Sequence, residues 1–383
     1  MTTVFDRTDG VAQTHALVIG VGRYRHLHGG ARPADDAMAR SLGQLGSPAT
    51  SALAVARFLV DEHVTDPEVP LGSVELAVSP AGPVDAASEI EVGGGRVPVE
   101  PATFARVRDA VDRWFSRCQR HTGNVAFLYF SGHGVAREHV ALLLEDFAER
   151  PQELFEHAVD LEALHLGMAA CRASTHFVDA CRSVPPALLE RREVRARALL
   201  DGWHRGPRPD APIVYATGHD EKAFGRPGGL TRYADALLRA LHGLGARREK
   251  GAWRVTTDQV GLAVAEVLRH GNEVPGTPVQ HAQVVGSGRG SVLRVLPGVP
   301  GVPFRLGCDP AAATDAASMR LIALRDGRLA DHRDGGSGDW LGEVAAGAYD
   351  FQVHFERRDF RDGRLEVVAY PPWLDDLLPV EPA

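Results

Sequence analysis

Short apolar runs alternate with stretches of helical periodicity from the N-terminus to about Gly290. The apolar runs are residues 16–19, 74–78, 125–130, 177–180 and 213–217, and their near-continuous apolar character is typical of parallel strands buried on both faces. Helices are predicted between them, over residues 52–60, 104–115, 161–170, 231–244 and 258–271. This alternation predicts βαβ units and a mostly parallel sheet.

The ends of these elements carry local signals. Four residues of the types that cap helix N-termini precede predicted helices, namely Thr103, Asp160, Thr231 and Asp258. Gly271 is expected to end the last of these helices. Residues 80–101 are rich in Gly, Pro and Ala, which predicts an exposed loop.

The pattern changes after about Gly290. The runs 292–296, 304–307, 319–324, 349–356 and 365–369 mostly alternate apolar with polar residues between Gly and Asp turns, and no long helical pattern competes with them. Such spacing is typical of a small β-sandwich. We therefore predict two domains, an α/β domain over residues 1–290 and an accessory β-sandwich domain over residues 295–383.

Composition narrows the class of partner and the compartment. The chain of 383 residues has a net charge of −8, which argues against a nucleic-acid partner. No apolar run is long enough to span a bilayer, and the first residues lack the layout of a signal peptide. The four cysteines show no metal-ligand spacing and suit a reducing setting. We expect a cytoplasmic protein with no nucleic-acid or membrane partner and no metal site.

Two predicted strands end in reactive side chains. Residues 128–134, LYFSGHG, carry His133, and residues 176–183, HFVDACRS, carry Cys181. Functional groups gather outside the carboxyl ends of parallel strands, so neighbouring strands would place the imidazole and the thiol in one crevice. A thiolate can attack a carbonyl carbon while the imidazole supplies the proton for the leaving amine.

Blander interpretations apply to each group alone. A Gly-His-Gly sequence is most often a turn, and a single cysteine is most often a buried small hydrophobe. Both groups at strand ends, in this order, favour a catalytic pair. Cys171 competes with Cys181, but it follows a predicted helix and no apolar strand precedes it. Cys181 is therefore the expected nucleophile.

These segments resemble a known family. FLYFSGHG at 127–134 and FVDACRS at 177–183 resemble the caspase and metacaspase-like cysteine proteases, including bacterial members. ALVIGVGRY at 16–24 is a weaker likeness, and the whole resemblance covers about residues 14–290. His133 precedes Cys181 by 48 residues, close to the ≈ 50 of caspases. The resemblance implies a caspase–haemoglobinase fold, a Cys–His dyad, and an oxyanion hole made by the N–H groups of Gly134 and Cys181.

The resemblance also implies substrate-binding residues. Metacaspase-like enzymes often carry an aspartate two residues before the cysteine, on the floor of the specificity pocket, which here is Asp179. It implies cleavage after Arg or Lys through a charge-assisted contact. The alternative is a carboxylate that only orders the cysteine loop. An acidic position after the first strand corresponds to Asp35 or Asp36 in PADDA, or else the aligned position is Ser51-Ala52. Ala216 and Thr217 lie where the family pairs the substrate backbone as an added strand.

Activation and partners follow from the family likeness alone. No cofactor is implied; some metacaspases need calcium, but no segment here has the ligand spacing of a calcium loop. Residues 182–212 form a self-cleavage segment or, as the favoured alternative, a solvated helix over 186–200; the arginines concerned are Arg191, Arg192, Arg195, Arg197, Arg205 and Arg208.

The expected function is that of a cysteine endopeptidase acting on protein or peptide substrates. Family members suggest a regulated bacterial effector in stress or antiviral defence, with a sensor or regulatory protein as partner. One alternative is a catalytically inactive caspase-like scaffold that binds partners through the C-terminal β-domain. Another is acyl transfer or other thiol chemistry on the same fold.

Overall fold

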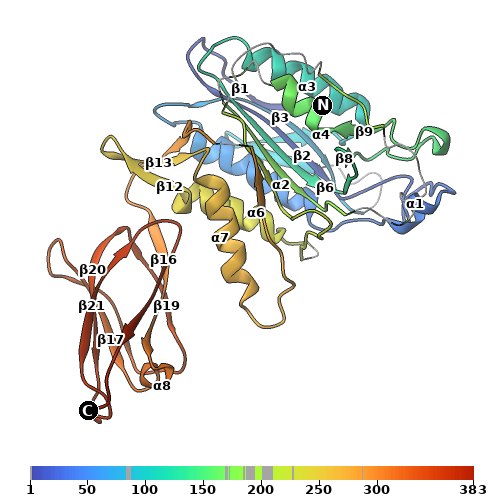
Figure 1. Ribbon diagram of the computed structural model, residues 1–383. Coiled ribbons are helices and arrows are strands. Elements are labelled where there is room, and N and C mark those ends of the chain that lie inside the picture. Colours follow the sequence, from blue (N-terminus) through green and yellow to red (C-terminus); the bar gives the residue numbers. More distant parts are fainter. Residues whose placement is uncertain are drawn as a thin grey trace. The chain divides into compact units, whose positions relative to one another are not determined.

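The computed structural model describes residues 2–82, 88–168, 171, 173–183, 186, 195–200, 210–226, 228–286 and 288–383. It divides into two compact units (Figure 1). The first comprises Met1–Leu238 and Thr256–Val295, and the second Arg239–Val255 and Leu296–Ala383. Among the described residues, no helix is long and apolar enough to cross a membrane.

A seven-stranded mixed sheet forms the centre of the first unit, in the order β1-β3-β2-β6-β10-β11-β14. Its five inner strands run parallel: β3 (Leu71–Ser79), β2 (Thr14–Val21), β6 (Val125–Gly132), β10 (Ala173–Ala180) and β11 (Ile213–Tyr215). The predicted parallel strands are confirmed. The edge strands β1 (Thr2–Asp6) and β14 (Gln283–Val285) pair antiparallel, which the apolar pattern did not indicate.

Helices cover both faces of this sheet (Figure 1). On one face, α3 (Phe104–Cys118) and α4 (Leu161–Gly167) share an apolar core with β2, β6 and β10. The opposite face holds α2 (Pro48–Phe58), α6 (Arg232–Arg239) and α7 (Val260–Asn272). A Cβ on Gly20 would lie 2.6 Å from the Ala52 side chain, so the absence of a side chain lets α2 approach the sheet closely.

Three of the four predicted caps occupy the N-cap position, two of them with a side-chain bond, and the fourth, Asp258, is wrong. The Asp160 carboxylate accepts the Ala163 N–H (2.9 Å) and the Thr231 hydroxyl accepts the Ala234 N–H (3.0 Å). Thr103 occupies the N-cap position of α3 without a side-chain capping bond, and Asp146 from a distant segment accepts the N–H of Phe104, the first helical residue. Asp258 accepts the Thr256 hydroxyl, and α7 begins only after Gln259. Local spacing does not indicate a partner such as Asp146, which is distant in sequence.

Residues 80–101 are not a simple loop. They contain the antiparallel hairpin of β4 (Ser88–Val92) and β5 (Gly95–Val99). Gly93 and Gly94 join the two strands with φ of 58° and 80°. Paired positive φ values are those of a tight hairpin turn, which glycine adopts without strain.

The remaining elements of the first unit are short. A three-stranded sheet of β7 (Gly134–Ala136), β8 (Val140–Leu143) and β9 (Ala158–Asp160) follows His133 directly. The others are α1 (Ala37–Ser41), η1 (Leu59–His63), η2 (Pro151–Glu153) and β15 (Val292–Val295).

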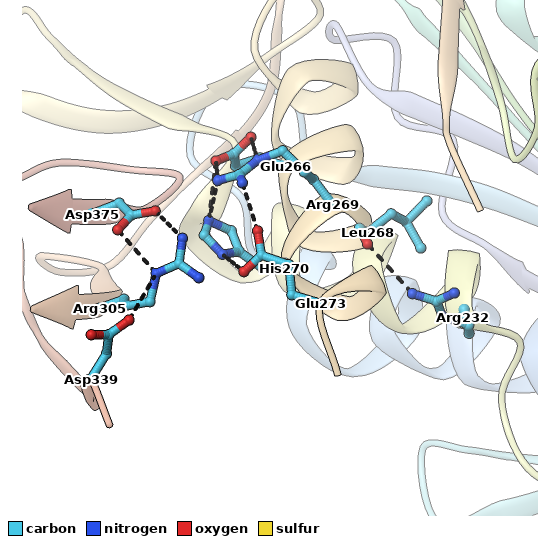
Figure 2. A network of polar contacts seen from close by, with 9 residues as sticks. All are labelled: Arg232, Glu266, Leu268, Arg269, His270, Glu273, Arg305, Asp339 and Asp375. Carbon is cyan, nitrogen blue, oxygen red and sulfur yellow. Dashed lines mark hydrogen bonds and ion pairs between the residues drawn. The ribbon is translucent and has the colours of Figure 1, made fainter. Parts of the chain in front are cut away.

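The surface of α7 carries a ladder of ion pairs (Figure 2). Arg269 pairs with Glu266 (2.7 Å) and with Glu273 (2.9 Å), three residues before it and four after. His270 lies 3.2 Å from Glu266. Exposed pairs at these spacings stabilise a helix by about 0.2–0.5 kcal/mol each, so they support α7 without deciding the fold.

The second unit confirms the predicted β-sandwich. One sheet has the order β19-β16-β22 and the other β18-β17-β20-β21, and both contribute to one apolar core. The strands are β16 (Gly301–Asp309), β17 (Ser318–Ala323), β18 (Leu329–Asp334), β19 (Trp340–Ala345), β20 (Gly347–His354), β21 (Gly363–Ala369) and β22 (Leu374–Pro379). Phe304 and Trp340 meet edge to face, with ring centroids 5.1 Å apart. The unit also contains η4 (Ala240–Leu244), the hairpin β12 (Ala246–Glu249) and β13 (Ala252–Thr256), and α8 (Ala311–Thr314).

Candidate active site

Strand register brings His133 and Cys181 together. β6 and β10 are neighbours, and Gly132 pairs with Ala180, so His133 and Cys181 are the next residues of two adjacent parallel strands. A Cβ on Gly134 would lie 2.7 Å from the Cys181 carbonyl oxygen. The chain that follows His133 therefore packs on the cysteine backbone, as only glycine permits. The expectation that the two strands are neighbours is confirmed.

The imidazole of His133 is held by a hydrogen bond to one ring nitrogen and by packing against an aromatic ring. Its Nε2 lies 2.8 Å from the Gly43 carbonyl oxygen. A carbonyl can only accept, so Nε2 carries the hydrogen, and the neutral ring has its lone pair on Nδ1. The Tyr24 ring packs 4.9 Å away, centroid to centroid. Burial lowers the pKa of His133, although the Gly43 hydrogen bond acts in the opposite direction. The lowered pKa keeps the ring neutral at pH 7.

The thiol of Cys181 is partly buried and accepts one backbone hydrogen bond. The Ala223 N–H lies 3.3 Å from Sγ. Burial raises the pKa of Cys181, and the nearby Asp179 adds to this, whereas the Ala223 N–H and Lys222 lower the pKa. The net effect is upward, so the resting thiol is protonated and needs a base to become a nucleophile.

Asp179 lies on β10, two residues before Cys181, and is only 3% exposed. Its Oδ2 accepts three hydroxyl groups, from Tyr129 (2.8 Å), Ser131 (3.0 Å) and Thr231 (2.5 Å). Its Oδ1 is buried and has no hydrogen-bond partner among the described residues. Burial raises the pKa of Asp179 to about 6, although the three hydroxyls oppose this. A buried carboxylate oxygen without a partner is costly, and a reason for it is needed.

A loop contacts the cysteine from the next strand. Residues 218–226, which we call the covering loop, follow β11, and the Ala223 N–H that reaches Sγ belongs to it. The Arg182 N–H donates to the Glu221 carbonyl (3.3 Å), and the Asp220 N–H donates to the Arg182 carbonyl (3.1 Å). The covering loop thus pairs with the residue after Cys181 and contacts the thiol through the Ala223 N–H.

Both ends of the covering loop are anchored. The Ser47 hydroxyl donates to the Arg226 carbonyl (2.6 Å). The Gln280 side chain accepts the Phe224 N–H (3.2 Å) and donates to the Ala216 carbonyl (3.0 Å). Gln280 therefore holds the loop and the end of β11 in one arrangement.

Comparison with known proteins identifies the family to which the chain belongs. Residues 13–273 match the family described as the caspase domain. The chain belongs to this family of cysteine peptidases. An uncharacterized protein of Sinorhizobium fredii, y4kE, is 27% identical over 214 residues, which are 54% of this chain and 60% of that protein. The chain thus spans less than two thirds of the length of this relative.

Two solved structures are similar to the chain at low identity. The protein GSU0716 of Geobacter sulfurreducens is 15% identical, with a TM-score of 0.41 over 72% of this chain and 94% of that one. Caspase-1 of Spodoptera frugiperda is 11% identical, with a TM-score of 0.42 over 76% of this chain and 91% of that one.

In this caspase domain, Ala216 and Thr217 are buried directly after β11. The Ala216 N–H donates to the Val178 carbonyl (2.8 Å), and its carbonyl is bonded to Gln280. The Thr217 hydroxyl donates to the Ala180 carbonyl (3.4 Å). Pairing of a substrate strand with Ala216 would have to replace these bonds.

The acidic candidates after β2 have local partners. Asp35 is exposed and forms an ion pair with Arg40. Asp36 caps α1, because its Oδ1 accepts the Met38 N–H (2.9 Å). Ser51, at the alternative aligned position, lies in α2 and accepts the Thr231 N–H (3.0 Å). The Thr231 hydroxyl in turn donates to Asp179, so Ser51 is connected to that carboxylate through Thr231, whereas Asp36 supports a helix.

Sequence reasoning missed three groups of this site. Tyr24 stands at the end of the ALVIGVGRY segment, but nothing there indicates that it reaches His133. Thr231 was identified only as a helix cap, and it also binds Asp179. Gly43 contributes a carbonyl, which no side-chain pattern can indicate.

Two clusters of possible metal ligands among the described residues include neither His133 nor Cys181. They are His139 with Asp160 and Glu162, and Asp146 with Glu149 and His157. Their carboxylates already serve the fold, since Asp160 and Asp146 cap helices and Glu162 accepts the Val140 N–H (2.8 Å). Neither cluster by itself indicates a metal site.

The competing cysteine and the arginine segment can be placed in part. Cys171 is 4% exposed and packs in the core with Cys118. Arg195 and Arg197 are exposed, and the Arg197 N–H donates to the Ala158 carbonyl of β9 (2.8 Å). Arg191, Arg192, Arg205 and Arg208, and most of the helix predicted over 186–200, lie outside the described residues, and the described residues 195–200 are not helical.

Proposed function

We propose that the protein is a cysteine endopeptidase in which Cys181 is the nucleophile and His133 the general base. The observation that carries the proposal is the adjacency of the two groups at the ends of paired strands, with Nε2 of His133 bound to Gly43. This bond leaves Nδ1 as the basic atom.

The chemistry follows from the resting protonation states. Both the thiol and the imidazole are neutral, since burial raises the pKa of Cys181 and lowers that of His133. His133 removes the thiol proton as Sγ attacks the carbonyl carbon of the substrate. The N–H groups of Gly134 and Cys181 are proposed to receive the oxyanion, each worth about 2.7–4 kcal/mol. The imidazolium then protonates the leaving amine, and water hydrolyses the acyl-enzyme with His133 again as base.

Asp179 is proposed to select arginine or lysine before the scissile bond. Its partnerless Oδ1 supports this, because a guanidinium or ammonium group would satisfy the orphaned acceptor and the buried charge together. The carboxylate is only 3% exposed in the closed arrangement. A substrate side chain that reaches Oδ1 must therefore displace part of what buries the carboxylate, and Asp35, Asp36, Ala216 and Thr217 remain proposed contacts of the substrate.

A panel of fluorogenic peptides that differ in the residue before the scissile bond tests this function. We expect turnover after Arg and Lys, and loss of turnover in Cys181→Ala and in His133→Gln. The exposed substitution His332→Gln, in β18 of the second unit, serves as the matched histidine control. Cleavage only after Asp would remove the role of Asp179, and full activity of Cys181→Ala would remove the dyad.

The same panel distinguishes the alternatives. No turnover of any peptide, with and without calcium, would favour a caspase-like scaffold that binds partners through the β-sandwich. Transfer of the acyl group to an added amine without hydrolysis would favour acyl transfer. A role as a regulated bacterial effector in stress or antiviral defence, with a sensor protein as partner, stays a prediction from the family.

A further inference from the structure

The contacts of His133 converge on two residues of the first unit. Its backbone N–H donates to the Tyr24 hydroxyl (2.7 Å), and its ring packs on the Tyr24 ring. Its Nε2 is bound to the carbonyl of Gly43, the residue before Gln44. Tyr24 and Gln44 belong to different loops. The contacts that fix one loop relative to the other therefore determine the position of the imidazole.

The Gln44 side chain makes that connection. Its Oε1 accepts the Tyr24 N–H (2.7 Å), and its Nε2 donates to the Tyr24 carbonyl (3.1 Å) and to the His28 carbonyl (3.0 Å). One carboxamide thus binds both polar groups of the Tyr24 backbone. The contacts form a closed circuit that runs from the imidazole through Gly43, Gln44 and Tyr24 back to the backbone of His133.

The burial and hydrogen bonds of Tyr24 suit it to hold His133 in a fixed position. Its side chain is fully buried, and burial raises the pKa of its hydroxyl far above the usual value. The hydroxyl therefore stays protonated, and it can donate to the Leu143 carbonyl (3.4 Å) while it accepts from His133. A Cβ on Gly132 would lie 2.8 Å from this hydroxyl oxygen, so glycine makes room for it.

The loop that carries Gly43 is also fixed through its backbone. The Leu45 N–H donates to the Gly22 carbonyl (2.8 Å). A Cβ on Gly22 would lie 2.5 Å from the Leu45 carbonyl oxygen, so this close approach also needs glycine. The Gly43 carbonyl is therefore presented from a supported loop, and the Gln44 side chain sets its place relative to Tyr24.

We infer that Tyr24 and Gln44 form a clamp that positions the His133 imidazole for proton transfer. The inference rests on the proposed function of His133 as base. Gln44 keeps the Gly43 carbonyl at Nε2 and so selects the tautomer with its lone pair on Nδ1. Tyr24 fixes the ring plane and the backbone of His133. Both are positioning residues, because they act through His133.

The substitutions Tyr24→Phe and Gln44→Met test the clamp. Each removes hydrogen bonds of the circuit while keeping the size of the side chain, so we expect kcat to fall about tenfold with KM changed less than about twofold. The double substitution should cost less than the product of the single effects, since both act on one imidazole. Tyr349→Phe is the matched tyrosine control, as its hydroxyl bonds the Ala345 carbonyl (2.6 Å) in the second unit.

Histidine-labelled NMR measures the clamp without turnover. We expect His133, assigned by comparison with His133→Gln, to show the Nε2–H tautomer in the parent protein and a tautomer mixture in Gln44→Met. Unchanged kcat together with an unchanged tautomer in both variants would overturn the inference. A tautomer change in a protein that cleaves no peptide would sustain the clamp and count against the proposed function. Gln44 is only partly buried, so Gln44→Met should fold even if Tyr24→Phe does not.

Discussion

Replacing Asp179 by asparagine should stabilise the fold at neutral pH while it removes activity toward arginine. Burial raises the pKa of this carboxyl from 3.8 to about 6. For such a group the folded state loses stability as the carboxyl ionises. The loss begins as the pH passes the ordinary value and is complete above about 6. The pKa difference corresponds to about 3 kcal/mol.

The pH dependence is the quantity to measure. Asparagine does not titrate. Any pH-independent effect of the substitution on stability, such as an amide group left unpaired where Oδ1 was, therefore cancels when the stability differences at two pH values are subtracted. Of the expected 3 kcal/mol, about 2 kcal/mol should develop between about pH 4.5 and pH 7.5. The free energy of unfolding of Asp179→Asn, relative to that of the parent protein, should therefore increase by that amount as the pH rises.

Urea unfolding followed by tryptophan fluorescence gives this difference, because Trp114 is fully buried against the central sheet. Asp112→Asn, at an exposed position of α3, is the matched control and should show no comparable growth with pH. In parallel, kcat/KM for arginine peptides should fall at least about 100-fold in Asp179→Asn, because a charged, buried contact is lost.

Two results would refute the reasoning. A stability difference between Asp179→Asn and the parent that does not change with pH would show that burial does not perturb this carboxyl. A variant that is less stable and cleaves arginine peptides normally would show that Asp179 only orders the cysteine loop. A gain in stability with a loss of activity would identify a residue kept for function at the expense of the fold.

Three further predictions concern the thiol, the covering loop and processing. Cys181→Ala should abolish hydrolysis, while Cys171→Ala should retain it within about twofold because that thiol is buried in the core; equal loss in both would contradict the assignment of the nucleophile. Ser47→Ala removes the 2.6 Å bond to the covering loop, so iodoacetamide should alkylate Cys181 about threefold to tenfold faster, and an unchanged rate would show that this bond does not restrain the loop. Self-cleavage should give new N-termini within residues 182–212, and mass spectrometry that finds only intact chain in an active sample would exclude it.

Much of the parallel sheet, and the adjacency of the strand ends that carry His133 and Cys181, could be predicted from the sequence. Buried parallel strands have near-continuous apolar runs, which the chain displays at 125–130 and 177–180. Reactive residues just beyond such runs lie at one edge of the sheet if the strands are neighbours. His133 and Cys181 met this condition through the pairing of Gly132 with Ala180. These are local properties, and a local pattern is sufficient to reveal them.

The polar surroundings of the site were decided only by the tertiary structure. The Gly43 carbonyl, the Tyr24 hydroxyl and the Thr231 hydroxyl come from loops and helix ends far from the dyad in sequence. At the start of α3, likewise, the Asp146 carboxylate from a distant segment accepts the Phe104 N–H, while Thr103 occupies the N-cap position without a side-chain bond. Hydrogen-bond partners of buried groups are chosen among everything that folding brings near, and spacing along the chain does not encode that choice. The sequence alone indicated the two groups proposed to carry the chemistry, and the folded chain determined which hydrogen bonds and packing contacts surround them.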